Sequence, residues 1–297
     1  MNKLIAQLQR LYFFDDQQWH SQKLDAGGTI ASYPEKSALT PAIVAKSLTG
    51  EANLGLNLIN PRGMVRAMVI NFKRAGDWDR VANLYQSLED ELDLPAPAIS
   101  VSGQQGYRLW FSLAEPLPAA QASLFLNALG LNYLTDLPLA HFELCPGNDN
   151  GQAVTELVPA LHLATGKWSA FIDPRLGGMF IDEPGLEMAP NMVNQAGILA
   201  SLKSIKAEEF QRALSTLQMA AEADSKGAEA ASDLQSQAND LPALDTKRPR
   251  SMLKVGEDFR DPQSFLLAVI NDSSASAGQR IKAAKALLPY FANSKPE

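Results

Sequence analysis

Residues 68–116 read MVINFKRAGDWDRVANLYQSLEDELDLPAPAISVSGQQGYRLWFSLAEP, and this segment decides the fold. It opens with an apolar run, Met68–Phe72, that breaks at Lys73 into polar residues, as a buried strand does when a site lies at its end. Apolar residues then recur at helical spacing; they are Val81, Leu84, Tyr85, Leu88 and Leu92. This spacing predicts a helix that packs one face on a sheet.

The second half of the segment predicts two strands joined by a glycine turn. Ala98–Val101 is typical of a short strand, and the two glycines of Ser102–Gly106 permit positive φ and a close approach of backbones. From Tyr107 onwards the sequence alternates, which predicts a strand with a period of two. One set is Tyr107, Leu109, Phe111 and Leu113, and the other is Arg108, Trp110 and Ser112. In such a strand Arg108 points away from the face that carries Tyr107 and Leu109.

Further helices and strands are expected on both sides of this segment, so the fold class is α+β. The expected helices are Asn2–Phe14, a helix that begins at Thr40-Pro41, and Pro118–Leu129. The expected strands are Leu54–Leu58, His141–Cys145 and Ser169–Ile172. The segment between the first helix and Ser37 is expected to be a loop, because it holds Gly27-Gly28 and Tyr33-Pro34.

The domain organisation follows from a change in composition near the C-terminus. Residues 1–205 are expected to form the core, 206–250 a helix and a flexible linker, and 251–297 a segment of two short helices. Two helices alone cannot bury both of their apolar faces. This small helical tail is therefore expected to dock on the core or on a partner protein.

Composition sets limits on compartment and partners. The chain has 297 residues, 46% of them hydrophobic, without an apolar run of the roughly 20 residues needed to span a bilayer. Cys145 is the single cysteine, which excludes an intramolecular disulfide and favours a soluble cytoplasmic protein with no membrane partner. A net charge of −7 argues against strong nonspecific binding to nucleic acid. Basic residues nevertheless gather around the central strand; they are Arg62, Arg66, Lys73, Arg74 and Arg80.

Motifs of other enzyme classes are missing from the sequence. The three histidines, His20, His141 and His162, lack the spacing of a zinc site. Neither a phosphate-binding GxxxxGK[ST] loop nor a dinucleotide fingerprint follows a strand. The histidines therefore receive no predicted role.

Three motifs follow one another in a characteristic order. They are Gly76-Asp77-Trp78, then Ser102-Gly103 ahead of Gly106-Tyr107-Arg108-Leu109-Trp110, then Phe142-Glu143-Leu144-Cys145-Pro146 ahead of Val158-Pro159-Ala160-Leu161-His162. In this order, from Leu39 to Pro174, the chain resembles the archaeo-eukaryotic primase-polymerase superfamily, and most closely the primase domain of TOTE conflict systems. The resemblance implies a primase-like core with a central, mostly antiparallel sheet flanked by helices.

The resemblance also implies a catalytic centre, and this sequence departs from it. Asn71 and Lys73 stand where the family has two acids, Arg108 stands where it has a histidine, and Glu143 is the one acid that carries over. A lysine ammonium 4 Å from a divalent ion would be repelled by about 8 kcal/mol at an effective dielectric constant of 20. The catalytic site is therefore expected to be degenerate, with no bound metal or other cofactor.

The residues that remain suit the binding of phosphate groups. They are Lys73, Arg74 and Arg108, together with Ser102, Gly103, Gly106 and the backbone amides of their turn. A nucleoside triphosphate or a nucleic acid is the expected partner, in DNA replication or in a mobile element. For Arg108 an alternative stays open, namely a surface arginine paired with Glu115 or Glu143. Arg108→Ala is expected to weaken binding and to leave the fold intact.

Two rival functions remain. The first is an active primase-polymerase that uses Asp77, Asp79 and Glu143 to hold magnesium or manganese. The second is a non-catalytic interaction protein that assembles through its C-terminal helices. A salt bridge between Lys73 and Glu143 that fills the pocket would favour the second.

Overall fold

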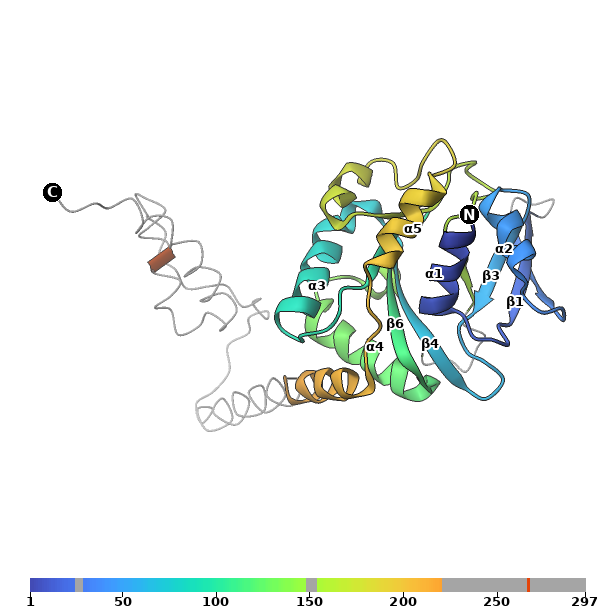
Figure 1. Ribbon diagram of the computed structural model, residues 1–297. Coiled ribbons are helices and arrows are strands. Elements are labelled where there is room, and N and C mark those ends of the chain that lie inside the picture. The colour runs from blue at the N-terminus through green and yellow to red at the C-terminus, as the bar shows by residue number, and fades with distance from the viewer. Residues whose placement is uncertain (25–28, 148–153, 221–265, 268–297) are drawn as a thin grey trace, which may run out of the picture. The chain divides into compact units, whose positions relative to one another are not determined.

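The computed structural model describes residues 1–24, 29–147, 154–220 and 266–267. The chain divides into two compact units, Met1–Leu234 and Gln235–Glu297. Every element named below belongs to the first unit, which is an α+β structure with two antiparallel sheets flanked by helices (Figure 1). The predicted linker beyond residue 220 and nearly all of the two-helix segment lie outside the described residues, so the domain boundaries stay predictions.

The larger sheet has five strands in the order β7-β4-β6-β5-β9. They are β7 (Phe142–Cys145), β4 (Met64–Phe72), β6 (Tyr107–Pro118), β5 (Ala98–Val101) and β9 (Ala170–Ile172). All neighbouring pairs are antiparallel. The predicted strands of residues 68–116 thus lie next to each other in the centre of one sheet, because a turn of a few residues returns β5 antiparallel onto β6.

The smaller sheet has four strands in the order β2-β1-β3-β8. They are β2 (Ile30–Glu35), β1 (Trp19–Leu24), β3 (Asn53–Asn57) and β8 (Val154–Glu156). The expectation of a loop up to Ser37 is wrong, since β1 and β2 pair there. Only Trp19 and His20 of these two strands are buried, so their sequences lack the apolar alternation that marks a strand. Pairing of β1 with the buried β3 forms the strand instead.

Helices cover both faces of the larger sheet (Figure 1). On one face, α3 (Trp78–Asp90), α4 (Ala119–Tyr133) and the helix at 207–220 share a core with Met68, Ile70 and Phe72 of β4. On the other face, α1 (Asn2–Tyr12) and α5 (Met192–Ala200) share a second core with Ala67 and Val69. Successive side chains of β4 point to opposite faces of the sheet, so they contribute to two separate cores.

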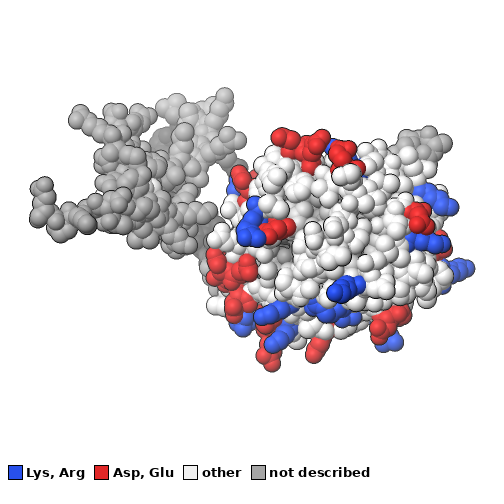
Figure 2. Space-filling view, turned by 45° about the horizontal axis from the view of Figure 1, so that its top comes forward, with Lys and Arg blue, Asp and Glu red and all other residues white. Residues whose placement is uncertain are grey.

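The remaining helices are short. The helix α2 (Pro41–Leu48) begins as predicted, since the Thr40 hydroxyl accepts a hydrogen bond from the Ile43 amide. Three 3₁₀ turns complete the described elements, η1 (Ala75–Asp77), η2 (Leu139–His141) and η3 (Pro174–Phe180). None of the described helices has the length and apolar character needed to cross a membrane. Figure 2 shows one face of the molecule, on which charged side chains of both signs surround a mostly uncharged centre.

Candidate functional site

A row of side chains crosses the larger sheet at a single level. Asn71 on β4 lies opposite Arg108 on β6 and opposite Glu143 on β7, and Arg108 lies opposite Ser100 on β5. Directly opposed residues project from the same face of a sheet, and Lys73 follows two residues after Asn71 on that face. The structure thus brings together the four positions that the resemblance assigns to one site.

Lys73 and Glu143 form an ion pair at one end of this row. The Lys73 Nζ atom lies 3.2 Å from the Glu143 Oε2 atom, and the side chains are 43% and 52% exposed. The pair is half open to solvent and does not fill a buried pocket. Because an ammonium group takes the place beside the one acid of the row, these residues do not fit the divalent ion that the resemblance implies. Within the described residues, no group of three or more His, Cys, Asp or Glu side chains is arranged to hold a metal ion.

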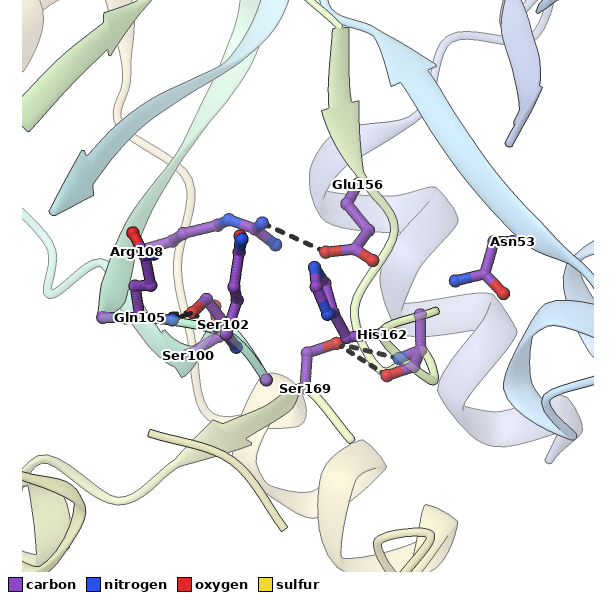
Figure 3. Close-up of polar contacts among 12 residues, drawn as sticks. Asn53, Ser100, Ser102, Gln105, Arg108, Glu156, His162 and Ser169 are labelled. Atoms are coloured by element: carbon purple, nitrogen blue, oxygen red, sulfur yellow. Dashed lines mark hydrogen bonds and ion pairs between the residues drawn. The ribbon is translucent and has the colours of Figure 1, made fainter. Parts of the chain in front are cut away.

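Arg108 forms a second ion pair, which links the two sheets. Its Nη2 atom lies 3.1 Å from the Oε2 atom of Glu156 on β8, and the side chains are only 12% and 8% exposed (Figure 3). The alternative of a surface arginine paired with Glu115 or Glu143 is therefore wrong. The Arg108 Nη1 atom is buried and has no hydrogen-bond partner in the structure. One guanidinium nitrogen of this pair thus remains free to donate.

His162 lies beside the Arg108–Glu156 pair (Figure 3). Burial lowers the pKa of its imidazole, Glu156 opposes this shift, and Arg108 adds to it. The Nδ1 atom lies 3.0 Å from the Thr165 hydroxyl, which itself donates to the Gly103 carbonyl at 2.6 Å. His162 thus joins the ion pair to the glycine turn.

Sequence reasoning missed Glu156 and His162 as parts of the site. Glu156 ends a strand of three residues, and its partner is 48 positions away on the other sheet. The sequence does contain one indication of Glu156. In the run Glu156-Leu157-Val158 an acid directly precedes apolar residues that are buried, and a buried acid requires a partner of opposite charge.

The Ser102–Gly106 turn uses its backbone amides internally. The Ser102 hydroxyl accepts hydrogen bonds from three amides, those of Gln104 at 3.1 Å, Gln105 at 3.0 Å and Gly106 at 3.0 Å. The amide of Gly103, a residue with φ of +74°, donates to the Pro184 carbonyl at 2.8 Å. All four amides predicted to face an anion therefore already donate a hydrogen bond within the protein. A phosphate could bind them only by displacing those acceptors.

Asp77 and His141 meet just beyond the end of β4. The Asp77 Oδ2 atom lies 3.2 Å from His141 Nδ1, and the Arg74 Nη1 atom lies 3.1 Å from His141 Nε2. Asp77 stands at the N-cap of α3 but makes no capping hydrogen bond with its side chain. The Asp77 carboxylate therefore contacts an imidazole and leaves the amides of α3 without a side-chain cap.

Similarity of this chain to known proteins is found among solved structures. No protein-family model matches the sequence, and no curated protein matches it. Among solved structures, the chain is similar to the AEP domain of the cyanophage S-2L primase-polymerase, with 14% identity over 67% of this chain and 97% of that one and a TM-score of 0.41. It is similar to the polymerase domain of Mycobacterium tuberculosis Ligase D in complex with DNA, with 13% identity over 67% and 85% and a TM-score of 0.40.

A third similar structure is that of the primase RepB′, with 12% identity over 99% of this chain and 88% of that one and a TM-score of 0.35. The names of these three structures are those of a primase-polymerase domain, a polymerase domain of a ligase and a primase. The identities and TM-scores are too low to support an argument about function, which has to come from the side chains of the site.

Proposed function

We propose that this chain is a primase-polymerase-like protein with a degenerate catalytic centre, which binds nucleic acid or a nucleoside triphosphate in DNA replication or in a mobile element. The observation that supports this proposal most is the row Glu143–Asn71–Arg108, with Lys73 at its end. In the sequence resemblance these positions form one polymerase site, and here they carry two cations and one carboxylate.

Binding is favoured over nucleotidyl transfer by the chemistry of this row. Polymerases hold two metal ions on carboxylates, so that the ions stabilise the attacking and the leaving oxygen. The row has one carboxylate, Glu143, and Lys73 already neutralises it at 3.2 Å. A guanidinium or ammonium group, by contrast, binds a phosphate without any metal. The side chains of the row therefore suit a ligand that carries phosphate.

Binding is expected to be weak at physiological salt and measurable at low salt. Lys73→Ala removes a cation and leaves Glu143 as an unpaired negative charge, so it is expected to raise the Kd for a single-stranded oligonucleotide about tenfold. It should also make the dependence of log K on log salt shallower by about 0.7, the contribution of one phosphate contact on a single strand. Titration of a labelled oligonucleotide at several salt concentrations measures both.

The matched control is Lys46→Ala, which removes one positive charge from an exposed position on α2. It is expected to change neither the Kd nor the salt slope by more than the measurement error. If Lys46→Ala and Lys73→Ala weaken binding equally, the binding is nonspecific. A flat titration of the full chain at low salt contradicts the proposal.

The second candidate is a non-catalytic interaction protein that assembles through its C-terminal helices. The Lys73–Glu143 pair does not fill a buried pocket, but it satisfies both charges without a ligand, and this favours the second candidate. This candidate predicts no binding of oligonucleotide or triphosphate and a loss of self-association when residues 261–297 are removed. Sedimentation of the full chain and of the truncated chain, beside the titration above, separates the two functions.

A further inference from the structure

Four cations, Lys73, Arg74, Arg80 and Arg108, lie near the C-terminal end of β4 and the N-terminal ends of α3 and β6, and three of them are paired with carboxylates. The pairs are Lys73 with Glu143, Arg80 with Asp136, and Arg108 with Glu156. Among the described residues no carboxylate pairs with the fourth cation, Arg74, whose side chain is exposed. Arg74 instead contacts the imidazole of His141, with 3.1 Å between Nη1 and Nε2.

The two neighbours of His141 contact different nitrogens of its ring. A guanidinium group has only donors, so the contact with Arg74 requires a lone pair on the Nε2 atom. The other nitrogen, Nδ1, lies 3.2 Å from the Asp77 Oδ2 atom; the two atoms are buried without a hydrogen bond, so the carboxylate favours a proton on Nδ1 through its charge alone. Both contacts are met by one species, the neutral imidazole with its proton on Nδ1.

The backbone fixes where this imidazole stands. The Lys73 amide donates to the His141 carbonyl at 2.7 Å, which ties η2 to the chain as it leaves β4. Asp77, the last residue of η1, contacts the imidazole from the other side. Its side chain makes no capping hydrogen bond with α3. A side-chain cap would stabilise α3, so the contact of the carboxylate with His141 replaces a favourable interaction.

We propose that Arg74 is the principal phosphate contact of this protein, and that His141 and Asp77 are the positioning residues that hold its guanidinium. This assignment depends on the proposed function, because it names a contact within the same site. A cation held by a neutral acceptor keeps its full charge for a ligand, whereas Lys73, Arg80 and Arg108 have to share theirs with a carboxylate. The guanidinium also keeps further N–H groups, which suit the two-oxygen grip on a phosphate.

Paired substitutions test the role of Arg74. Arg74→Ala is expected to raise the Kd for a single-stranded oligonucleotide at low salt at least tenfold. The matched control, Arg80→Ala, removes the same charge six positions away but frees Asp136, and it is expected to change the Kd less than threefold. Parallel titrations with a nucleoside triphosphate and with inorganic phosphate show whether the ligand is a nucleic-acid backbone or a free phosphate group.

Substitutions of His141 test the positioning role separately. His141→Ala should weaken oligonucleotide binding several-fold, and His141→Gln should restore most of it, because the glutamine oxygen can accept from Arg74 at the place of Nε2. Nitrogen NMR of the histidine-labelled full chain, without any ligand, should show the Nδ1–H tautomer of His141. Asp77→Ala should shift it toward the Nε2–H tautomer.

The outcomes separate failure of the proposed function from failure of the role assigned to Arg74. If the full chain binds neither oligonucleotide nor triphosphate, the proposed function fails and the role of Arg74 fails with it. If the chain binds but Arg74→Ala and Arg80→Ala weaken binding equally, only the assignment of Arg74 is overturned. If His141 is an Nε2–H tautomer, or if His141→Ala and His141→Gln bind alike, the positioning role is overturned.

Discussion

Arg108→Ala is expected to lower the free energy of unfolding by about 3–5 kcal/mol, the range for breaking a buried ion pair by removing one partner. The substitution leaves Glu156, whose side chain is 8% exposed, as a buried charge without a partner, and it removes the link between the two sheets. Urea unfolding followed by circular dichroism measures the change. The sequence-based expectation that this substitution leaves the fold intact is therefore replaced by its opposite.

Two variants serve as controls for this prediction. Replacing both partners together, as Arg108→Met with Glu156→Leu, should recover most of the lost stability, since a buried pair can be exchanged for apolar residues at little cost. Arg175→Ala breaks a solvent-exposed pair with Asp173, in which the arginine is 87% exposed, and should leave the urea midpoint nearly unchanged. An Arg108→Ala variant as stable as the parent chain would show that the pair is not buried in solution.

Gly106→Ala is expected to destabilise the fold by about 3 kcal/mol, at the upper end of the range for overpacking a core. An added Cβ atom at this position would lie 2.0 Å from the Phe72 carbonyl oxygen and 3.0 Å from the Arg74 amide nitrogen. Both neighbours are backbone atoms, so the end of β4 or the glycine turn has to move. Denaturant midpoints of the variant and the parent chain measure the effect.

The control for this prediction is Gly76→Ala, where an added Cβ atom would meet nothing within 4 Å. This substitution should change the midpoint little. Equal midpoints for the two alanine variants would contradict the close approach of the turn to β4.

The parts of the fold that the sequence predicted are those with a local pattern. The strand β4 and the strand β5 are short apolar runs, the helix α3 buries residues at helical spacing, and β6 alternates between two sets of residues; each pattern is visible within a dozen residues. The β1–β2 hairpin escaped prediction because β2 is largely exposed and carries no such pattern. Its position is set by pairing with β3, which is a tertiary contact.

The same distinction applies to the candidate site. The family resemblance implies that Asn71, Arg108 and Glu143 share one site, and the strands place them opposite one another. The partners of the charged groups could not be predicted. Arg108 binds a carboxylate on the other sheet, and Arg74 binds an imidazole from a turn 67 positions away. Such contacts depend on how the sheets and turns pack against one another. A local sequence pattern carries no information about that packing.

A primer-synthesis and extension assay with magnesium and with manganese, run beside oligonucleotide binding on the same preparation, tests the central claim most directly. The claim is that the basic residues at the end of β4, Lys73 and Arg74, bind phosphate, and that the row Glu143–Asn71–Arg108 no longer catalyses nucleotidyl transfer, because Lys73 pairs with its one carboxylate. The expected result is salt-dependent binding without any extended product under either metal. Robust synthesis by the unmodified chain, abolished by Glu143→Ala, would contradict the account and establish an active enzyme.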